Sequence, residues 1–382
     1  MTARPTTTDP GRIACLFSTS GHSGVDRLAK HLLPALARRG YRVDLLKVRG
    51  HGPDLAEAAV ETPNLGIVDL GSRHTYACVP AIVLYLRRHR PAVLLSDKDR
   101  VNRTALAALA LAGGGTRLYL RSGTTLSVDL ASRGALERWL QRQSVARLYP
   151  RAAGVLVPSR GAAQDLVGFA GLDPALIRVV PTPVVPDALF DTPLPAPNHA
   201  WFHDPAAPLI LGVGELSRRK DFATLVRAFA ALRAERPCRL MILGEGAERG
   251  RLAALAAEVG VAADLDLAGF MPRPYGALAH ADLFVLSSRW EGMPLVLVEA
   301  LAMGTPVVST DCPSGPREVL DDGRVGQLVP VGDAPALAAA MAATLAAPAD
   351  ASRLREAVRP YAVERGTDAY LDAFALPRHW TG

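Results

Sequence analysis

Two glutamates with seven residues between them are the feature of the sequence most suggestive of chemistry. Glu291 precedes a glycine, and Glu299 lies within an apolar run. In a helix, a rise of ~1.5 Å per residue would separate their carboxylates by roughly 10 to 12 Å. Paired carboxylates that hydrolyse glycosidic bonds lie closer, about 5 to 9.5 Å apart. The spacing therefore favours contacts to two ends of one elongated ligand. The simpler alternative is a solvated loop residue and a polar helix face.

The elements around this pair place Glu291 at the edge of a sheet. Residues 281–287 read as a buried strand, 294–303 as a helix that ends at Gly304, and 306–309 as the next strand. Glu291 thus lies in a loop that leaves the carboxyl end of a strand. In open α/β sheets, anionic ligands bind at that edge, beside the free N–H groups of the following helix.

A basic loop precedes another helix earlier in the chain. Residues 209–213 read as a strand, Asp221 can cap the next helix, and Arg218, Arg219 and Lys220 lie between them. Cations at this edge can neutralise a diphosphate and the charge that develops as it departs. The alternative is a merely solvated basic loop.

Two further loops carry candidate ligand contacts in the first half of the chain. The first follows the predicted strand 12–17, and its candidates for a phosphate or acceptor contact are Gly21, His22, Ser23 and Gly24. Its spacing is neither a dinucleotide fingerprint nor a P-loop, so hydride transfer and nucleoside triphosphate hydrolysis lose support. A tight surface turn is the alternative.

The second of these loops follows the predicted strand 117–120. Arg121 and Thr124 are candidates for substrate contact there, with a structural turn as the equal alternative.

The chain organisation predicts two domains, because 382 residues exceed one ordinary core. Strands in the first half are expected at 12–17, 42–48, 92–96, 117–120 and 154–157, alternating with helices. Eight prolines from Pro181 to Pro208 mark a linker, after which a second alternating series begins. We therefore expect two doubly wound α/β domains, at 1–185 and 209–360, joined by a proline-rich linker at 186–208.

Charge and cysteine content limit the classes of function. Residues 1–190 hold 25 Lys or Arg against 14 Asp or Glu, while residues 191–382 hold 18 against 23. A basic first half can face anionic lipid or a phosphate-bearing acceptor, or can simply aid solubility. Nucleic acid is not expected as a partner, because no basic patch interleaved with aromatic residues occurs. The four cysteines lack disulfide-framework or zinc spacing, which favours a reducing cytoplasm.

The sequence predicts no segment that spans a bilayer and leaves contact with a membrane surface as one alternative. Residues 1–10 lack the apolar run of a signal peptide, and the alanine-rich stretches are too short to span. The predicted helix 134–149 carries Arg138 and Arg142 beside apolar residues, so it could rest on a membrane or pack on its own domain.

Several motifs together resemble a known family. They are Glu291-Gly-Met-Pro with Glu299-Ala, and the segments 21–24, 212–222, 244–246, 269–270 and 311–318. This set is similar to the E-x7-E signature and its companion motifs in the retaining glycosyltransferases of family 4. The resemblance implies the GT-B fold, in which two Rossmann-like domains face each other across a cleft. It further implies an acceptor-binding first domain, a donor-binding second domain, and a carboxyl-terminal segment, 361–382, that packs back on the first.

The resemblance also implies roles for residues of the second domain. Glu291 would bind hydroxyls of the donor sugar and Glu299 those of the ribose, while Lys220 would neutralise the diphosphate. The remaining donor-binding positions implied are Gly214, Arg219, Gly269, Phe270, Met271, Gly292, Met293 and Pro294.

Two positions depart from the family pattern. Glu215 stands where the family has an arginine, so Arg218 or Arg219 would supply the missing charge. Gly123 or a neighbour stands where relatives often have a histidine near the transferred sugar.

The implied activity is retaining transfer of a hexose or N-acetylhexosamine from a UDP- or GDP-linked donor, without metal or other cofactor. The acceptor would be a glycan, a polyprenyl-linked sugar or a lipid, in cell-surface polysaccharide or lipopolysaccharide biosynthesis. The expected location is the cytoplasm, with peripheral attachment to the inner face of the membrane as an option. A non-catalytic nucleotide-sugar-binding protein, or a GT-B epimerase or phosphorylase relative, are the alternatives.

Overall fold

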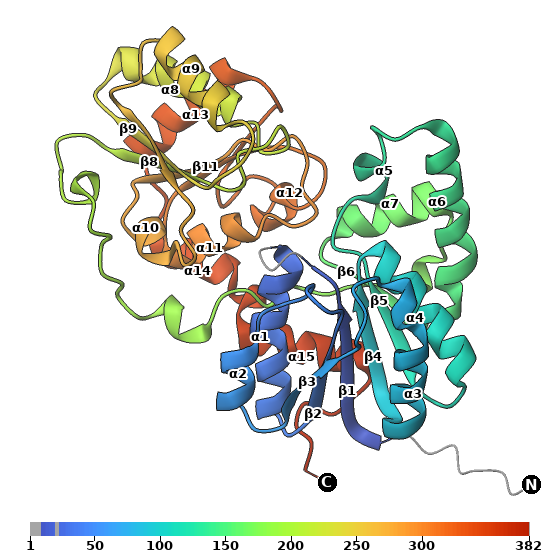
Figure 1. Cartoon of the computed structure of the whole chain (residues 1–382). Helices are drawn as coiled ribbons and strands as arrows, with labels where there is room; N and C mark the ends of the chain where they lie inside the picture. Colours follow the sequence, from blue (N-terminus) through green and yellow to red (C-terminus); the bar gives the residue numbers. More distant parts are fainter. Residues whose placement is uncertain (1–8, 20–22, 382) are drawn as a thin grey trace, which may run out of the picture. The chain divides into compact units, whose positions relative to one another are not determined.

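The computed structural model describes residues 9–19 and 23–381. The chain forms two compact units (Figure 1). The first unit runs to Val184 and resumes at Val363, and the second comprises Val185–Ala362. Residues 186–208 therefore belong to the second unit.

The first unit contains a seven-stranded parallel sheet with the order β3-β2-β1-β4-β5-β6-β7. Its strands are β1 (Asp9–Phe17), β2 (Arg42–Lys47), β3 (Leu65–Asp69), β4 (Pro91–Asp97), β5 (Arg117–Arg121), β6 (Gly154–Val157) and β7 (Ile177–Val179). Its helices are α1 (Gly24–Arg38), α2 (Ala56–Glu61), α3 (Val79–His89), α4 (Asp99–Ala112), α5 (Leu126–Asp129), α6 (Ala135–Leu148), α7 (Arg160–Ala170) and α15 (Val363–Phe374).

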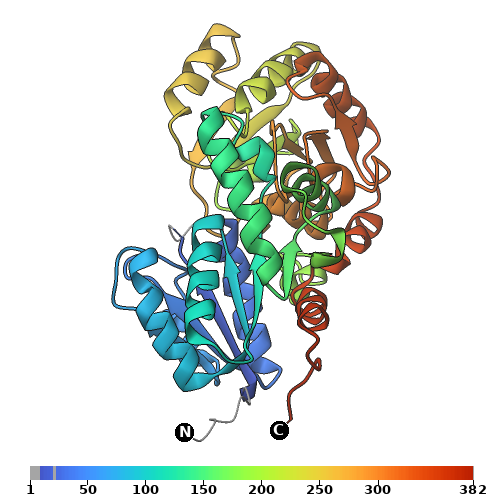
Figure 2. The same ribbon diagram turned by 90° about the vertical axis from the view of Figure 1, so that its right-hand side faces the viewer.

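Alternate residues of the central strand β1 fill two separate cores. Ile13, Cys15 and Phe17 pack with residues of α1 and α15 on one face of the sheet. Ala14 and Leu16 pack with α3 and α4 on the other face, which lies toward the viewer in Figure 2. A parallel sheet covered on both faces needs apolar side chains on both, as the continuous run in β1 provides.

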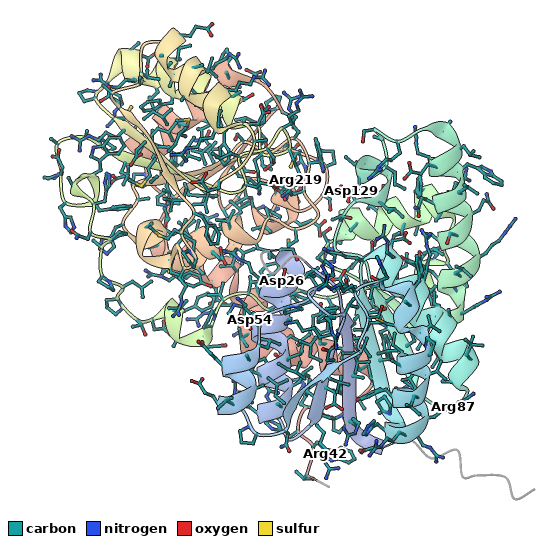
Figure 3. All side chains as sticks on the ribbon, viewed as in Figure 1. Asp26, Arg42, Asp54, Arg87, Asp129 and Arg219 are labelled. Carbon is teal, nitrogen blue, oxygen red and sulfur yellow. The ribbon has the colours of Figure 1, made fainter. Side chains whose placement is uncertain are left out.

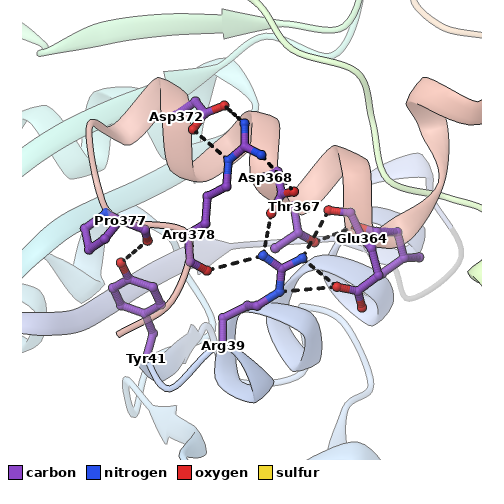
Figure 4. Close-up of polar contacts among 9 residues, drawn as sticks. Arg39, Tyr41, Glu364, Thr367, Asp368, Asp372, Pro377 and Arg378 are labelled. Carbon is purple, nitrogen blue, oxygen red and sulfur yellow. Dashed lines mark hydrogen bonds and ion pairs between the residues drawn. The ribbon is translucent and has the colours of Figure 1, made fainter. Parts of the chain in front are cut away.

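The carboxyl-terminal segment is tied to the first unit by an ionic cluster (Figure 4). The guanidinium of Arg39, just after α1, lies 2.6 Å from Glu364 and also contacts Asp368, both on α15. The hydroxyl of Tyr41 donates to the carbonyl of Pro377 at 2.5 Å. These contacts join residues more than 300 positions apart and attach the carboxyl-terminal segment to the rest of the first unit.

The second unit contains a six-stranded parallel sheet with the order β10-β9-β8-β11-β12-β13. Its strands are β8 (Leu209–Val213), β9 (Arg239–Leu243), β10 (Leu265–Gly269), β11 (Leu283–Leu286), β12 (Val307–Thr310) and β13 (Gln327–Val329). Its helices are α8 (Phe222–Glu235), α9 (Arg249–Glu258), α10 (Tyr275–Ala279), α11 (Leu295–Met303), α12 (Pro316–Val319), α13 (Ala334–Ala346) and α14 (Ala351–Ala357).

The second sheet reverses its strand order between β8 and β11, which are neighbours although β9 and β10 intervene in sequence. The loops that leave the carboxyl ends of β8 and β11 therefore emerge side by side. Such a switch point is where doubly wound sheets bind ligands.

Short 3₁₀ helices complete both units, at Tyr76–Cys78, Tyr149–Arg151, Pro174–Leu176, Asp187–Phe190, Ala200–Phe202 and Arg359–Tyr361. Within residues 9–19 and 23–381, no helix combines the length and the apolar character needed to cross a bilayer.

Candidate functional site

The loop after β8 begins with a backbone that only glycine allows. A Cβ on Gly214 would lie 2.9 Å from Cε of Lys220, and a Cβ on Gly244 would lie 1.8 Å from the carbonyl oxygen of Gly214. The loops after β8 and β9 therefore pack backbone to backbone. As a result, the side chain of Lys220 can run back over Gly214 toward the sheet edge.

Three groups converge on the carboxylate of Glu291 in the loop after β11. The ammonium of Lys220 lies 2.7 Å from Oε1 and the guanidinium of Arg219 lies 2.9 Å from Oε2. The hydroxyl of Ser288 donates to Oε1 at 2.7 Å. Arg219 is labelled in Figure 3. The sequence predicted these charges on two loops, and the structure joins them into one cluster with a net charge of plus one.

The cluster is largely shielded from solvent. Glu291 is 3% exposed and Lys220 is 8% exposed. Burial alone would raise the pKa of Glu291, but the charges of Lys220 and Arg219, with the hydrogen bonds from Lys220 and Ser288, hold it below its ordinary value. Glu291 is therefore an ionised acceptor and is poorly suited to act as a proton donor.

Hydrogen bonds between the two loops position this cluster. The Ser287 hydroxyl donates to the carbonyl of Lys220 at 2.8 Å, and the N–H of Arg289 donates to the carbonyl of Arg219 at 2.8 Å. From β12, the Thr310 hydroxyl donates to the carbonyl of Ser288 at 2.6 Å. These positioning residues were missed from the sequence, although hydroxyl residues close to Glu291 are a usable signal.

The loop after β12 makes a hydrogen bond with the residues that follow Glu291. Gly292, Met293 and Pro294 are buried. The Ser314 hydroxyl donates to the carbonyl of Gly292 at 3.2 Å. These three residues directly precede α11, and their contacts with a donor sugar stay predictions.

Glu299 lies on α11 and is 1% exposed. The other residues of this helix are apolar. The predicted contact of Glu299 with ribose stays a prediction.

The residue that follows β10 is aromatic and largely exposed to solvent. Phe270 is 59% exposed and Met271 is half-buried. Gly269 adopts a left-handed conformation, with φ of 85°, and its carbonyl accepts from the N–H of Gly244 at 2.7 Å. The predicted donor-binding roles of Gly269, Phe270 and Met271 stay predictions.

Arg218 and Arg219 diverge, although they are consecutive. Arg219 binds Glu291, whereas Arg218 is exposed and lines a neighbouring pocket with Ser217 and Asp221. Glu215, at the position of the family arginine, is also exposed. Of the two candidates for the missing cation, Arg219 is the one that joins the Glu291 cluster.

Asp26 binds two described residues of the glycine-rich loop, and it was not predicted from the sequence. Gly21 and His22 lie outside the described residues. Ser23 precedes α1, which begins at Gly24, and its N–H and hydroxyl donate to Asp26 at 2.7 and 2.6 Å. The hydroxyl of Thr19 also donates to Asp26, which is 1% exposed and is labelled in Figure 3. The signal was the spacing of a capping box, Ser-x-x-Asp.

Arg121 has internal partners that favour the structural alternative. Its guanidinium lies 2.5 Å from Asp97 and donates to Tyr370 at 3.0 Å and to Thr182 at 3.1 Å. Burial alone would lower the pKa of Arg121, but its interactions with Tyr370 and Asp97 raise it. Thr124, by contrast, is exposed, and its contact with substrate stays a prediction.

The departure at Gly123 has a steric basis. A Cβ at this position would lie 2.8 Å from NH1 of Arg121. A histidine here would have to displace the buried guanidinium. Gly123 and Arg121 therefore form one structural arrangement.

No group of three or more His, Cys, Asp or Glu suited to a metal ion occurs within the described part of the chain.

Comparisons with known proteins match both units. The family described as Glycosyltransferase Family 4 matches residues 22–188, and Glycosyl transferases group 1 matches residues 199–362.

Among curated relatives is the N-acetylgalactosamine-N,N'-diacetylbacillosaminyl-diphospho-undecaprenol 4-alpha-N-acetylgalactosaminyltransferase of Campylobacter jejuni. It is 33% identical over 233 residues, which is 61% of each chain. The lipopolysaccharide core biosynthesis glycosyltransferase LpsE of Rhizobium meliloti is 37% identical over 186 residues, 47% of this chain and 54% of that protein. The chain thus spans less than two thirds of the length of either relative.

Solved structures share the fold over nearly the whole chain. The lipopolysaccharide outer core galactosyltransferase WaaB has a TM-score of 0.74 at 18% identity, and covers 95% of this chain and 99% of its own. Anabaena Alr3699/HepE in complex with UDP and glucose has a TM-score of 0.77 at 16% identity, with the same coverage. These similarities confirm the expected GT-B fold with two Rossmann-like domains.

Proposed function

Because this chain belongs to glycosyltransferase family 4, we propose that it transfers a hexose or N-acetylhexosamine from a nucleotide diphosphate sugar to a glycan or lipid-linked acceptor. The observation that carries the proposal is the cluster of Lys220, Arg219 and Glu291 at the switch point of the second sheet. It offers two cations for a diphosphate and one ionised carboxylate for sugar hydroxyls.

In the proposed reaction, the donor diphosphate shares the N–H donors of Lys220 and Arg219 with Glu291. The bond between the anomeric carbon and the phosphate oxygen breaks, and the acceptor oxygen bonds to that carbon on the same face. The departing phosphate oxygen takes the acceptor proton, so configuration is retained and no protein nucleophile is needed. The two cations stabilise the charge that develops on the leaving group.

The nucleotide is proposed to extend from this cluster toward the exposed ring of Phe270, with Glu299 at its ribose. Uridine and guanosine are the candidate nucleosides. Support for uridine comes from HepE, whose solved complexes contain UDP and UDP-glucose.

The acceptor is proposed to be a lipid-linked or lipopolysaccharide-type glycan in cell-surface polysaccharide biosynthesis. The Campylobacter relative is named for a diphospho-undecaprenol acceptor, and LpsE is named for the lipopolysaccharide core.

The proposal includes attachment to the inner face of the membrane through α6. Leu136, Trp139 and Leu140 lie at helical spacing and are 70%, 53% and 52% exposed. Arg138 and Arg142 are exposed on the same helix. Apolar side chains beside arginines suit an anionic bilayer surface. We expect wild type to co-sediment with anionic vesicles and Arg138→Glu/Arg142→Glu to remain in the supernatant; wild type that fails to bind ends this part of the proposal.

The test of transfer is nucleotide release from a panel of UDP- and GDP-sugars in the presence of membrane extract. We expect release by wild type and by the control Glu258→Ala, which alters an exposed glutamate at the end of α9, but not by Glu291→Ala. Tight donor binding without release from any donor would instead support the non-catalytic binding protein. Release with free phosphate as the only acceptor would support a phosphorylase.

A further inference from the structure

The pocket that Arg218 lines lies within the second unit, beside the Glu291 cluster. Its volume is about 520 Å³, and it is bounded by the loop after β8, the first turns of α8 and α9, and the loop after β11. Neither Lys220, Glu291 nor Glu299 lines it. It is therefore distinct from the proposed donor site.

The pocket has an excess of positive charge. Four arginines line it, together with Asp221 and Glu248; these arginines are Arg218, Arg227, Arg251 and Arg289. Arg289 pairs with Asp221 at 3.1 Å, and Arg251 pairs with Glu248 at 3.1 Å. Among the described residues, Arg218 and Arg227 have no ion-pair partner. Both side chains are exposed, so their charges are available to a ligand.

A buried hydroxyl in the pocket wall also lacks a partner. Oγ of Ser217 is shielded from solvent and makes no hydrogen bond within residues 9–19 and 23–381. A buried polar atom without a hydrogen bond is unfavourable, and a ligand oxygen would satisfy it. The first turn of α8, a 14-residue helix, adds N–H groups that have no acceptor within the helix.

Part of the remaining wall is apolar, since Phe222, Ala223 and Leu252 contribute to it, and Thr224 and Gly332 complete the lining. A volume of about 520 Å³ exceeds that of a bare anion and falls in the range of small-molecule sites. A phosphate monoester carries a charge of about −1.5 to −2 at neutral pH, which matches the two uncompensated arginines. Its organic part would rest on the apolar wall.

We propose that this pocket binds a small, soluble phosphate monoester, such as a sugar phosphate, at a site separate from the donor site. Arg218 and Arg227 bind the phosphate, and Ser217 donates to one of its oxygens. Because Arg218 directly precedes Arg219, one short loop serves both sites.

The experiment is calorimetric titration of the full chain with glucose 6-phosphate and, separately, with UDP. The pocket variant is Arg227→Gln, which removes one of the two proposed phosphate ligands and alters an exposed side chain. The matched control is Arg38→Gln, which removes one exposed arginine from the first unit. We expect glucose 6-phosphate to bind the pocket variant at least tenfold more weakly than wild type or control. The affinity for UDP should stay within twofold in all three proteins.

Three outcomes would overturn the proposal. The first is no binding of glucose 6-phosphate or of inorganic phosphate by wild type. The second is displacement of glucose 6-phosphate by stoichiometric UDP, which would place both ligands in one site. The third is variant-sensitive binding only to vesicles that contain phosphatidic acid, which would assign the monoester to a lipid headgroup. Calorimetric binding needs no turnover. An absence of phosphate binding can therefore be distinguished from an absence of transferase activity.

Discussion

Replacement of Lys220 by methionine tests the charge cluster most sharply. The change keeps an apolar stem but removes one donor from Glu291, which is 3% exposed. Removing a hydrogen bond to a charged group costs about 1.5–3 kcal/mol, and breaking a fully buried ion pair costs about 3–5 kcal/mol. Because Arg219 and Ser288 remain as partners, we expect a loss of about 2 kcal/mol in the free energy of unfolding, within the first range and below the second.

A double-mutant cycle separates the ion pair from other effects of the change. Glu291→Gln removes the carboxylate that Lys220 neutralises, so the double variant should recover at least about 1 kcal/mol relative to the sum of the two single losses. The assay is urea-induced unfolding followed by circular dichroism, at neutral pH. Losses that add within about 0.5 kcal/mol would refute an energetic coupling between Lys220 and Glu291.

The same pair predicts a dependence on pH. Because the pKa of Glu291 is lowered in the folded protein, its ionisation stabilises the fold above the ordinary glutamate pKa, and this stabilisation is lost as pH falls through the lowered value. The stability difference between wild type and Glu291→Gln should therefore shrink as the buffer is acidified from pH 6 toward and below pH 4. A difference that grows on acidification would contradict the direction of the shift.

The catalytic consequence of Lys220→Met should exceed its effect on stability. Loss of one donor to developing negative charge lowers kcat by about 10²–10³-fold. Nucleotide release is the readout, under conditions in which the variant is folded. Turnover at the wild-type rate would remove Lys220 from the proposed mechanism.

Three further substitutions test the first unit. Gly123→Ala places a Cβ 2.8 Å from the Arg121 guanidinium, so we expect a loss of about 1–3 kcal/mol in thermal or urea unfolding. Asp26→Ala removes the acceptor of Ser23 and Thr19, and we expect a loss of about 1–2 kcal/mol from the start of α1. Arg39→Ala breaks the contacts with Glu364 and Asp368, so limited proteolysis should cleave the carboxyl-terminal segment faster than in wild type.

For each of these three substitutions, one result would contradict the prediction. Wild-type stability of Gly123→Ala would show that the Arg121 guanidinium can shift at no cost. Full stability of Asp26→Ala would mean that water replaces the Asp26 carboxylate as the acceptor for Ser23 and Thr19. An unchanged cleavage rate in Arg39→Ala would assign the attachment of α15 to its apolar contacts alone. Arg38→Ala, one residue earlier and exposed, is the control for the last of these.

Central strands were predictable from the sequence because their residues are buried on both faces. The predicted ranges 154–157 and 209–213 coincide with β6 and β8, and the predicted helix 294–303 differs from α11 by one residue. The edge strands β3 and β7 were missed. Leu65 is the one buried residue of β3, and β7 has two exposed residues of three, so neither forms the continuous apolar run of a central strand.

The candidate site was predictable in its residue types but not in its contacts. Lys220 and Glu291 are 71 positions apart, and they meet because β8 and β11 are neighbours in the sheet. Which of two consecutive arginines faces Glu291 depends on hydrogen bonds between loops, such as that from Arg289 to Arg219, and no local pattern encodes these. Arg121 was ambiguous for the same reason, since its partners come from distant segments.

The measurement that tests the central claim most directly follows radiolabelled sugar from a nucleotide donor into the lipid-extractable fraction of a membrane preparation. We predict incorporation by wild type and by Glu258→Ala, and none above background by Glu291→Ala. Label that stays on the nucleotide with every donor, or equal incorporation by Glu291→Ala, would contradict the assignment of this chain as a glycosyltransferase that acts through the Glu291 cluster.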